Sequence, residues 1–227
     1  MMMLAVEGLI AGYDGVPVLH DINLTVDRGE VVTVLGANGA GKTTMLLAVA
    51  GDLAVQSGTV RFDTEVLSGP MHRRVRLGIG VVTEERSIFR QLTVDENLGL
   101  GRGAPELAFE LAPELRKIRN RKAGLLSGGE QQILTLARVL AAKPRLLLAD
   151  ELSLGLAPIV ADRMLSVVRD AADGGVAVLL VEQQAARALR VADRAYVLRR
   201  GRVVLEEAAV TLRGDLGRLS ASYLSDH

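Results

Sequence analysis

The chain has 227 residues, and 49% of them are hydrophobic, which is enough for a substantial core in one or two closely packed lobes. Its 27 Lys and Arg side chains balance 27 Asp and Glu side chains, so no basic excess indicates nucleic acid as a partner. The absence of cysteine excludes disulfides and thiolate metal sites, and no uncharged apolar run reaches the ~18 residues of a membrane-spanning helix. The N-terminal segment lacks the basic and apolar regions of a signal peptide, so we expect no secretory leader.

The N-terminal region alternates apolar and polar side chains from Leu4 to Thr25, with a turn signal at Asp14 and Gly15. This pattern predicts two or three antiparallel strands. Tyr13 stands out in this region because the chain has only three Tyr, three Phe and no Trp. An aromatic ring at a strand edge can stack on adenine, and the alternative is that Tyr13 packs on the sheet.

The next segment carries a phosphate-binding pattern. Glu30 to Gly36 reads as a buried strand, Gly36 to Thr44 (GANGAGKTT) matches the phosphate-loop motif, and an apolar-faced helix follows. Such a loop aims backbone N–H groups and a helix N-terminus at one anion, with Lys42 at the β- and γ-phosphates and the Thr43 hydroxyl on Mg²⁺. The alternative is a glycine turn that joins a strand to a helix. The candidate nucleotide-binding residues here are Gly36, Asn38, Gly39, Ala40, Gly41, Lys42, Thr43 and Thr44.

The middle of the chain predicts a small inserted lobe. From about Val94 to Leu125 the sequence is charged and shows helical spacing of apolar residues. We therefore expect residues 94–125 to form a helical subdomain inserted between residues 1–93 and 126–227 of a single domain. A basic cluster at residues 116–122 is either a solvated face or a docking surface for a partner or lipid head groups.

A second glycine-rich segment, Leu126 to Gln132 (LSGGEQQ), follows this lobe. Ser127 and the amides after it would form a second anion site at the start of a helix from Glu130 to Ala142. An ordinary N-cap and turn is the alternative. The candidate residues of this segment are Ser127, Gly128, Gly129 and Glu130.

Asp150 and Glu151 end an apolar run that begins at Pro144. A continuous apolar run is typical of a parallel strand covered on both faces, and ligands bind at the carboxyl ends of such strands. We expect Asp150 to serve Mg²⁺ through water, and Glu151 to orient and deprotonate the attacking water. The alternative is a pair of solvated loop acids. The phosphate loop, LSGGE and the acidic pair, in this order, predict an ATP hydrolase that works as a pair.

Further elements are predicted on either side of these motifs. The expected hairpins lie near residues 57–67 and at Arg200 and Gly201. The expected buried strands are Ile79 to Val82 and Val176 to Gln183, the latter followed by a helix. A short amphipathic helix of unclear role is expected after Thr211.

With these motifs in place, the chain resembles the ATP-binding cassette (ABC) ATPases over essentially its whole length. It is most similar to the ATPase subunits of branched-chain amino acid importers. Three segments carry this closer resemblance: SIFRQLTVDENL after the acidic TEER, LSLGLAP after the acidic pair, and VEQQ at the end of a predicted strand. The resemblance implies an α/β fold. We expect a phosphate-loop NTPase core with a mostly parallel sheet, an N-terminal antiparallel β subdomain and an inserted helical subdomain.

Two positions depart from most ABC ATPases but agree with this subgroup. Glu84 stands where glutamine is usual, and its carboxylate would ligate Mg²⁺ more strongly than an amide oxygen. Gln183 stands where histidine is usual, and its amide can donate to the γ-phosphate but cannot become cationic. Leu152 in place of the usual proline is a rarer departure, which we expect to reduce the rigidity of the loop beside Glu151. The helical subdomain also looks shorter than is usual in the subgroup.

The resemblance implies a mechanism in which two cassettes meet head to tail. ATP and Mg²⁺ held at Lys42 of one cassette are covered by Ser127 and Gly129 of the other. ATP binding closes the pair and hydrolysis opens it, which drives transmembrane permease subunits through the groove near Glu84 and Phe89. The implied partners are the permease subunits, a second ABC ATPase subunit in a hetero- or homodimer, and indirectly a periplasmic or extracellular solute-binding protein. The chain is then expected at the cytoplasmic face of the membrane.

Two other functions share these motifs. An ATPase for lipid or lipopolysaccharide export would carry nearly the same segments, although Gln183 argues against it. A cassette ATPase acting on ribosomes or DNA usually has two cassettes in tandem or a long insertion. This chain has a single cassette and no net positive charge, so we expect no nucleic-acid partner.

Overall fold

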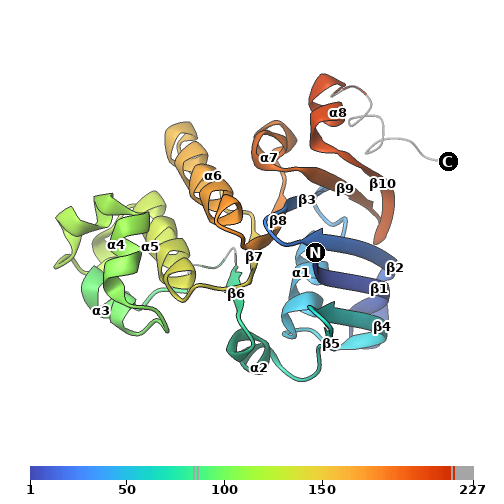
Figure 1. Cartoon of the computed structure of the whole chain (residues 1–227), viewed down its shortest axis with the longest axis horizontal. Helices are drawn as coiled ribbons and strands as arrows, with labels where there is room; N and C mark the ends of the chain where they lie inside the picture. The colour runs from blue at the N-terminus through green and yellow to red at the C-terminus, as the bar shows by residue number, and fades with distance from the viewer. Residues whose placement is uncertain (84, 86, 216, 218–227) are drawn as a thin grey trace.

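The computed structural model describes residues 1–83, 85, 87–215 and 217, which form two β-sheets with helices around them (Figure 1). The predicted α/β architecture is confirmed, with one antiparallel sheet and one mostly parallel sheet. Glu84, a predicted Mg²⁺ ligand, lies outside the described residues.

The N-terminal sheet is antiparallel, as the alternating pattern predicts, with the order β2-β1-β4-β5. Its strands are β1 (Met2–Tyr13), β2 (Val16–Asp27), β4 (Val55–Phe62) and β5 (Glu65–Val66). Asp14 and Gly15 join β1 to β2 with φ angles of 51° and 79°. Two left-handed residues in succession match the twist of a tight hairpin, which is why Asp-Gly is favoured there. This turn leaves Tyr13 at the end of β1.

The main sheet has the order β10-β9-β3-β8-β7-β6, and its strands are parallel except for β10. The strands are β3 (Val31–Leu35), β6 (Ile79–Val82), β7 (Leu146–Asp150), β8 (Ala177–Glu182), β9 (Arg194–Arg199) and β10 (Arg202–Ala208). Every residue of β3, β7 and β8 is buried, as continuous apolar runs predict for strands covered on both faces. The carboxyl ends of these three neighbouring strands therefore meet at one edge of the sheet, where ligands bind in open α/β folds.

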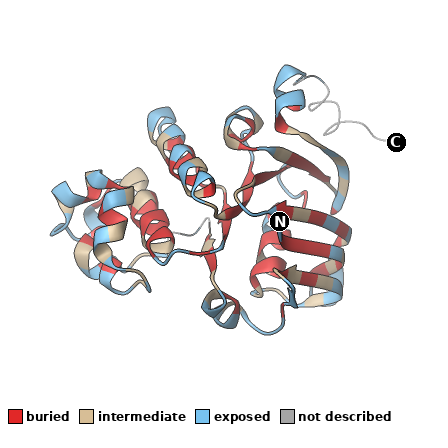
Figure 2. Cartoon of the chain, in the orientation of Figure 1, coloured by how far each residue is buried: buried red, intermediate tan, exposed pale blue. Residues whose placement is uncertain are grey.

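Different elements cover the two faces of the main sheet (Figures 1 and 2). The helices outside the inserted lobe are α1 (Lys42–Ala50), α2 (Met71–Arg76), α6 (Pro158–Asp173), α7 (Ala185–Val191) and α8 (Ala209–Gly214). In β8, Leu179 and Val181 pack in a core with α1 and the antiparallel sheet, whereas Val178 and Leu180 pack in a core with α6, α7 and α8. No element was predicted for the segments that form α2 and α6. The helix expected after Thr211 corresponds in part to α8, and residues 216 and 218–227 lie outside the description.

A third core holds together the helical lobe at the left of Figure 1. The lobe contains α3 (Val94–Gly99), α4 (Pro105–Leu111), the 3₁₀ helices η1 (Pro113–Ile118) and η2 (Ala123–Leu125), and α5 (Gly128–Ala141). α5 has apolar residues on two sides: Leu134 packs in the lobe core, and Leu136 packs in the core of the main sheet. This helix therefore ties the lobe to the sheet. The Arg and Lys side chains of the 116–122 cluster are exposed.

Candidate active site

A cleft of about 410 Å³ opens at the carboxyl edge of the main sheet, beside the start of α1. The predicted residues that line it are Tyr13, Asn38, Gly39, Gly41, Lys42, Thr43, Thr44, Glu151 and Gln183. Val18 and Leu154 complete the lining. The cleft therefore gathers residues from β1, the loop after β3, and the segments after β7 and β8, which are far apart in the sequence.

The loop from β3 to α1 requires glycine at three positions. A Cβ on Gly36 would lie 2.4 Å from the carbonyl oxygen of Leu198 in β9. Only glycine therefore lets the loop pass this close to β9. Gly39 and Gly41 have φ angles of 78° and 104°, which side chains disfavour. Within the described residues no side chain caps the N-terminus of α1, so its first N–H groups point outward as donors for an anion. Ala40 is buried beneath the loop.

Lys42 connects the phosphate loop to the acidic pair. Its Nζ donates to the carbonyl oxygens of Gly36 at 2.9 Å and Ala37 at 3.3 Å, and lies 3.7 Å from Glu151 Oε1. The Lys42 and Glu151 side chains are only 4% and 12% exposed, so water screens this ion pair weakly. The structure thus brings together the cation expected at the phosphates and the carboxylate expected at the attacking water.

The backbone of Glu151 is unusual for its residue type. Its φ angle is 46°, in the left-handed region, and its N–H donates to the Val181 carbonyl oxygen at 2.9 Å. Asp150 just before it is 1% exposed and ends β7. A left-handed non-glycine residue marks a position that the surrounding structure imposes, and such positions cluster at functional sites.

The oxygen ligands available here suit Mg²⁺. Thr43 presents a hydroxyl at the first turn of α1, and Asp150 presents a buried carboxylate at the end of β7. Across the described part of the chain, no group of three or more His, Cys, Asp or Glu side chains is placed to hold a metal ion. Mg²⁺ commonly binds through one or two protein oxygens, with water and substrate phosphates completing its octahedron. These two residues therefore fit Mg²⁺ that arrives with a nucleotide.

Gln183 directly follows β8 and is exposed in the same cleft, whereas Glu182 before it is buried at 1% exposure. Burial raises the pKa of the Glu182 carboxyl, hydrogen bonds from Ser153 oppose this rise, and the nearby charge of Glu151 adds to it. Its partners are the Ser153 backbone N–H at 3.0 Å and the Ser153 hydroxyl at 2.7 Å.

The raised pKa of Glu182 predicts a pH-dependent stability. Between the ordinary pKa of glutamate and the raised value, the folded chain binds more protons than the unfolded chain, so the free energy of unfolding falls as pH rises through this window. Glu182→Gln has no proton to release and should lose this part of the dependence. Urea unfolding of both chains from about pH 5 to about pH 8 measures it, and parallel pH profiles would contradict the prediction.

A sequence model of the ABC transporter family matches residues 19–153 of the chain. The chain belongs to this family. The high-affinity branched-chain amino acid transport ATP-binding protein BraG of Pseudomonas aeruginosa is 42% identical, over 92% of this chain and 94% of its own length. The lipopolysaccharide export system ATP-binding protein LptB of Haemophilus influenzae is 36% identical over 90% of each chain.

Solved structures of the family have the same fold. A nucleotide-free ATP-binding cassette from an ABC transporter matches 100% of both chains with a TM-score of 0.87 at 23% identity. A dimeric bacterial ABC transporter cassette matches 91% of this chain and 99% of its own with a TM-score of 0.81 at 27% identity. The predicted family and ATP hydrolase activity of this ABC ATPase are confirmed.

Tyr13 of the ABC ATPase is 47% exposed and lines the cleft from the end of β1. We expect its ring to stack on adenine, so Tyr13→Ala should weaken ATP binding by about 1–3 kcal/mol. Tyr13→Phe keeps the ring and should bind ATP as the wild type does. Titration with ATP and with inorganic triphosphate separates the adenine contact from the phosphate contacts. Equal ATP affinity in the wild type, Tyr13→Ala and Tyr13→Phe would show that Tyr13 packs on the sheet and does not contact adenine.

The LSGGE segment of the ABC ATPase lies away from this cleft. The Ser127 hydroxyl accepts from the Glu130 N–H at 3.3 Å, and the Glu130 carboxylate accepts from the Ser127 N–H at 2.7 Å, which forms a capping box at the start of α5. Gly128 and Gly129 open the helix, and a Cβ on Gly129 would lie 2.7 Å from Val160 of α6. Figure 1 places α5 and α1 on opposite sides of β6 and β7. Within one chain, the structure does not bring this segment to the phosphate loop.

The cleft also contains residues that sequence reasoning missed. Val18 lies on β2 with an apolar side chain like its neighbours, so no sequence signal separates a cleft-lining valine from a core valine. Leu154 is exposed in the turn after Glu151, where an apolar side chain outside a regular element was a detectable sign. Leu152, which replaces the usual proline, is fully buried in the core shared with α6, so apolar packing holds this position.

Proposed function

We propose that this ABC ATPase is the ATP-hydrolysing subunit of an importer for branched-chain amino acids or similar small solutes. The observation that carries the catalytic part is the meeting of Lys42 and Glu151, 3.7 Å apart, in a weakly exposed cleft. The solute class is supported by the 42% identity to BraG over nearly the whole chain. The chain would lie at the cytoplasmic face of the membrane, where ATP is available. In the described residues no helix is long and apolar enough to span a bilayer.

Several polar residues in and beside the cleft have a role in this proposal. Lys42 and the N–H groups at the start of α1 bind the β- and γ-phosphates, and Gln183 donates its amide to the γ-phosphate. Thr43, and Asp150 through water, would hold Mg²⁺, which would withdraw negative charge from the phosphate oxygens. The Glu151 carboxylate accepts a proton from the attacking water and orients it towards the γ-phosphorus. The left-handed backbone of Glu151 directs this side chain into the cleft.

A second cassette completes the site in this proposal. Ser127 is exposed and lies outside the cleft of its own chain, so its anion-binding helix start is available to another nucleotide. The likeness to a dimeric bacterial cassette supports a head-to-tail pair. The partner would be a related ABC ATPase or a second copy of this chain.

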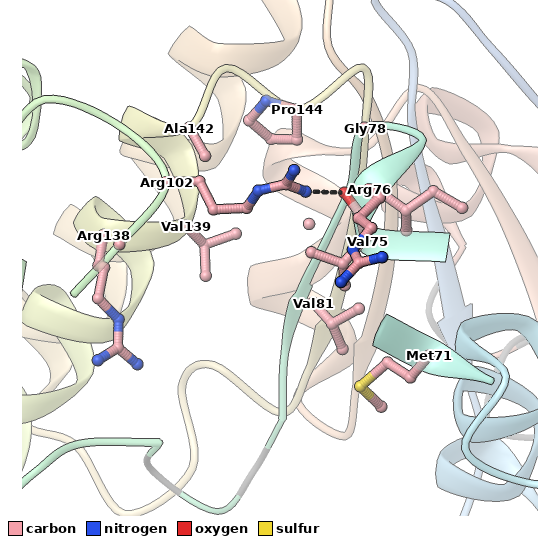
Figure 3. A pocket seen from close by; sticks show the side chains of 13 residues that line it. Met71, Val75, Arg76, Gly78, Val81, Arg102, Arg138, Val139, Ala142 and Pro144 are labelled. Atoms are coloured by element: carbon pink, nitrogen blue, oxygen red, sulfur yellow. Dashed lines mark hydrogen bonds between the residues drawn. The ribbon is translucent and has the colours of Figure 1, made fainter. Parts of the chain in front are cut away.

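The permease contact, expected near Glu84 and Phe89, is proposed at a second, apolar groove of about 470 Å³ beside that segment (Figure 3). Arg138 of its lining donates to the Ser87 carbonyl, two residues before Phe89. It lies between α2, β6 and α5, where the helical lobe meets the main sheet, and Val75, Val81 and Val139 line it. Its lining includes Arg76, Arg102 and Arg138 and, among the described residues, no acidic side chain. An amphipathic permease loop with acidic residues fits this surface by charge. A solute-binding protein would act indirectly, on the far side of the membrane.

Lipopolysaccharide export is the second candidate, favoured by the 36% identity to LptB. To separate the two, tagged Glu151→Gln is purified from native membranes with ATP present, and its partners are identified by mass spectrometry. The importer proposal predicts two permease chains, together with a second cassette ATPase where the pair is a heterodimer. Lys42→Ala treated identically is the control for ATP-dependent capture. Components of an export machinery in place of these chains would contradict import, and ribosomal or DNA-bound partners would contradict transport altogether.

A further inference from the structure

Glu182 is a buried acidic residue to which the proposed mechanism assigns no function. Both of its carboxylate oxygens are occupied by Ser153, one by the backbone N–H at 3.0 Å and the other by the hydroxyl at 2.7 Å. A desolvated carboxylate is tolerated only when donors satisfy it, so this set of bonds accounts for its position at the end of β8.

The Ser153 side of this contact lies in the turn that carries Glu151. The Glu151 carbonyl accepts from the Leu154 N–H at 3.1 Å, which makes Ser153 the third residue of that turn. At the other side of the turn, the Glu151 N–H donates to the carbonyl of Val181 in β8. β8 therefore holds this turn at two points, through the backbone of Val181 and through the Glu182 carboxylate.

The conformation held in this way is a strained one. Glu151 has a φ angle of 46°, and a residue with a side chain keeps a left-handed backbone only where its surroundings impose it. Without the bonds to Ser153, the turn would be free to relax and carry the Glu151 carboxylate away from Lys42.

We propose that Glu182 is a positioning residue for ATP hydrolysis, because its bonds to Ser153 hold the turn that aims Glu151 into the cleft. This inference rests on the proposed role of Glu151 as general base.

The proposal predicts a loss of turnover without a loss of ATP binding. The Lys42 side chain donates to the carbonyls of Gly36 and Ala37, whereas Glu182 accepts from Ser153, so the two sets of hydrogen bonds share no residue. The KM for MgATP should therefore stay within about twofold. Displacing a reacting group by ~1 Å can cost on the order of 100-fold, so kcat should fall about 10- to 100-fold in Ser153→Ala and in Glu182→Gln. Both substitutions change the bond between the Ser153 hydroxyl and the Glu182 carboxylate, so their effects in the double variant should be smaller than the sum of the two single effects.

Steady-state hydrolysis of MgATP by the full chain measures kcat and KM for these variants, and three further variants are measured for comparison. Ser153→Thr keeps the hydroxyl and should retain more activity than Ser153→Ala. Thr33→Val removes another buried hydroxyl bond, 3.1 Å to the Leu180 carbonyl on the same strand β8, and should lower the melting temperature while leaving kcat unchanged. Glu151→Gln is measured alongside. If Glu182→Gln does not fold, the comparison of kcat between Ser153→Ala and Ser153→Thr tests the proposal.

The outcomes separate this inference from the role of Glu151. Wild-type kcat in Ser153→Ala and Glu182→Gln, with turnover lost in Glu151→Gln, would overturn the positioning role alone. Wild-type turnover in Glu151→Gln would overturn the base assignment and this inference with it. A kcat for Thr33→Val as low as that of Ser153→Ala at equal melting temperature would show general damage to β8 and reject the proposal.

Discussion

Replacing Glu151 by glutamine is expected to lower ATP turnover by about 10²–10⁴-fold, because an amide cannot take the proton from the attacking water. The variant keeps the size of the side chain and removes its negative charge 3.7 Å from Lys42 Nζ. Without this charge, residue 151 no longer repels the phosphates of ATP. It also no longer competes with them for Lys42. ATP affinity should therefore be retained or increased, and the closed pair of cassettes should accumulate with ATP bound.

Single-turnover hydrolysis and equilibrium ATP binding, measured on the same preparation, check both parts of this expectation. Glu110→Gln, which makes the same substitution at an exposed position of α4, is the matched control and should behave as the wild type. Near wild-type turnover in Glu151→Gln would show that another group takes the proton. Loss of ATP binding in the variant would show that the carboxylate acts in binding.

Replacing Lys42 by alanine has the second large expected effect, a loss of ATP affinity together with activity. Hydrogen bonds to charged groups contribute about 1.5–3 kcal/mol each, which corresponds to roughly a 10- to 150-fold weaker binding of ATP. The loop itself should persist, because the positive φ angles of Gly39 and Gly41 and the close approach of Gly36 to Leu198 do not involve the lysine side chain. Direct titration with ATP measures the effect.

Lys117→Ala, in the exposed basic cluster of the helical lobe, removes the same charge away from the cleft and is the control. It should bind ATP as the wild type does. Unchanged ATP affinity in Lys42→Ala would mean that the phosphates bind elsewhere. A Lys42→Ala chain that binds ATP normally but does not hydrolyse it would restrict the lysine to the transition state.

The parts of the fold that the sequence predicts best are those where one local pattern has one physical meaning. The apolar run from Leu146 to Asp150 has the length of a strand and is too short for a buried helix, and a parallel strand covered on both faces buries all of its side chains. The hairpin after Tyr13 follows from Asp14 and Gly15, which accept the left-handed backbone that the turn needs. The phosphate loop follows equally from its glycines, since Gly36 must pass a neighbouring strand without a Cβ.

The parts that escaped prediction depend on partners distant in the sequence. α6 is an exception, because Pro158 at its first turn and the helical spacing of its buried residues are local signals that were not recognised. In the sequence, Glu182 is the last residue of an apolar strand. Nothing local indicates that Ser153, which is 29 residues earlier, donates a hydrogen bond to its carboxylate. The left-handed backbone of Glu151 likewise depends on β8, so the sequence predicts the acid but not its orientation.

The central claim is that ATP is hydrolysed in this cleft by Lys42 and Glu151, under a second cassette. A crystal structure of Glu151→Gln with MgATP tests it most directly. The account predicts phosphates at Lys42, Mg²⁺ at Thr43 and Asp150, the γ-phosphate facing residue 151, and Ser127 of another cassette on the same nucleotide. ATP bound outside this cleft, or a γ-phosphate directed away from residue 151, would contradict it.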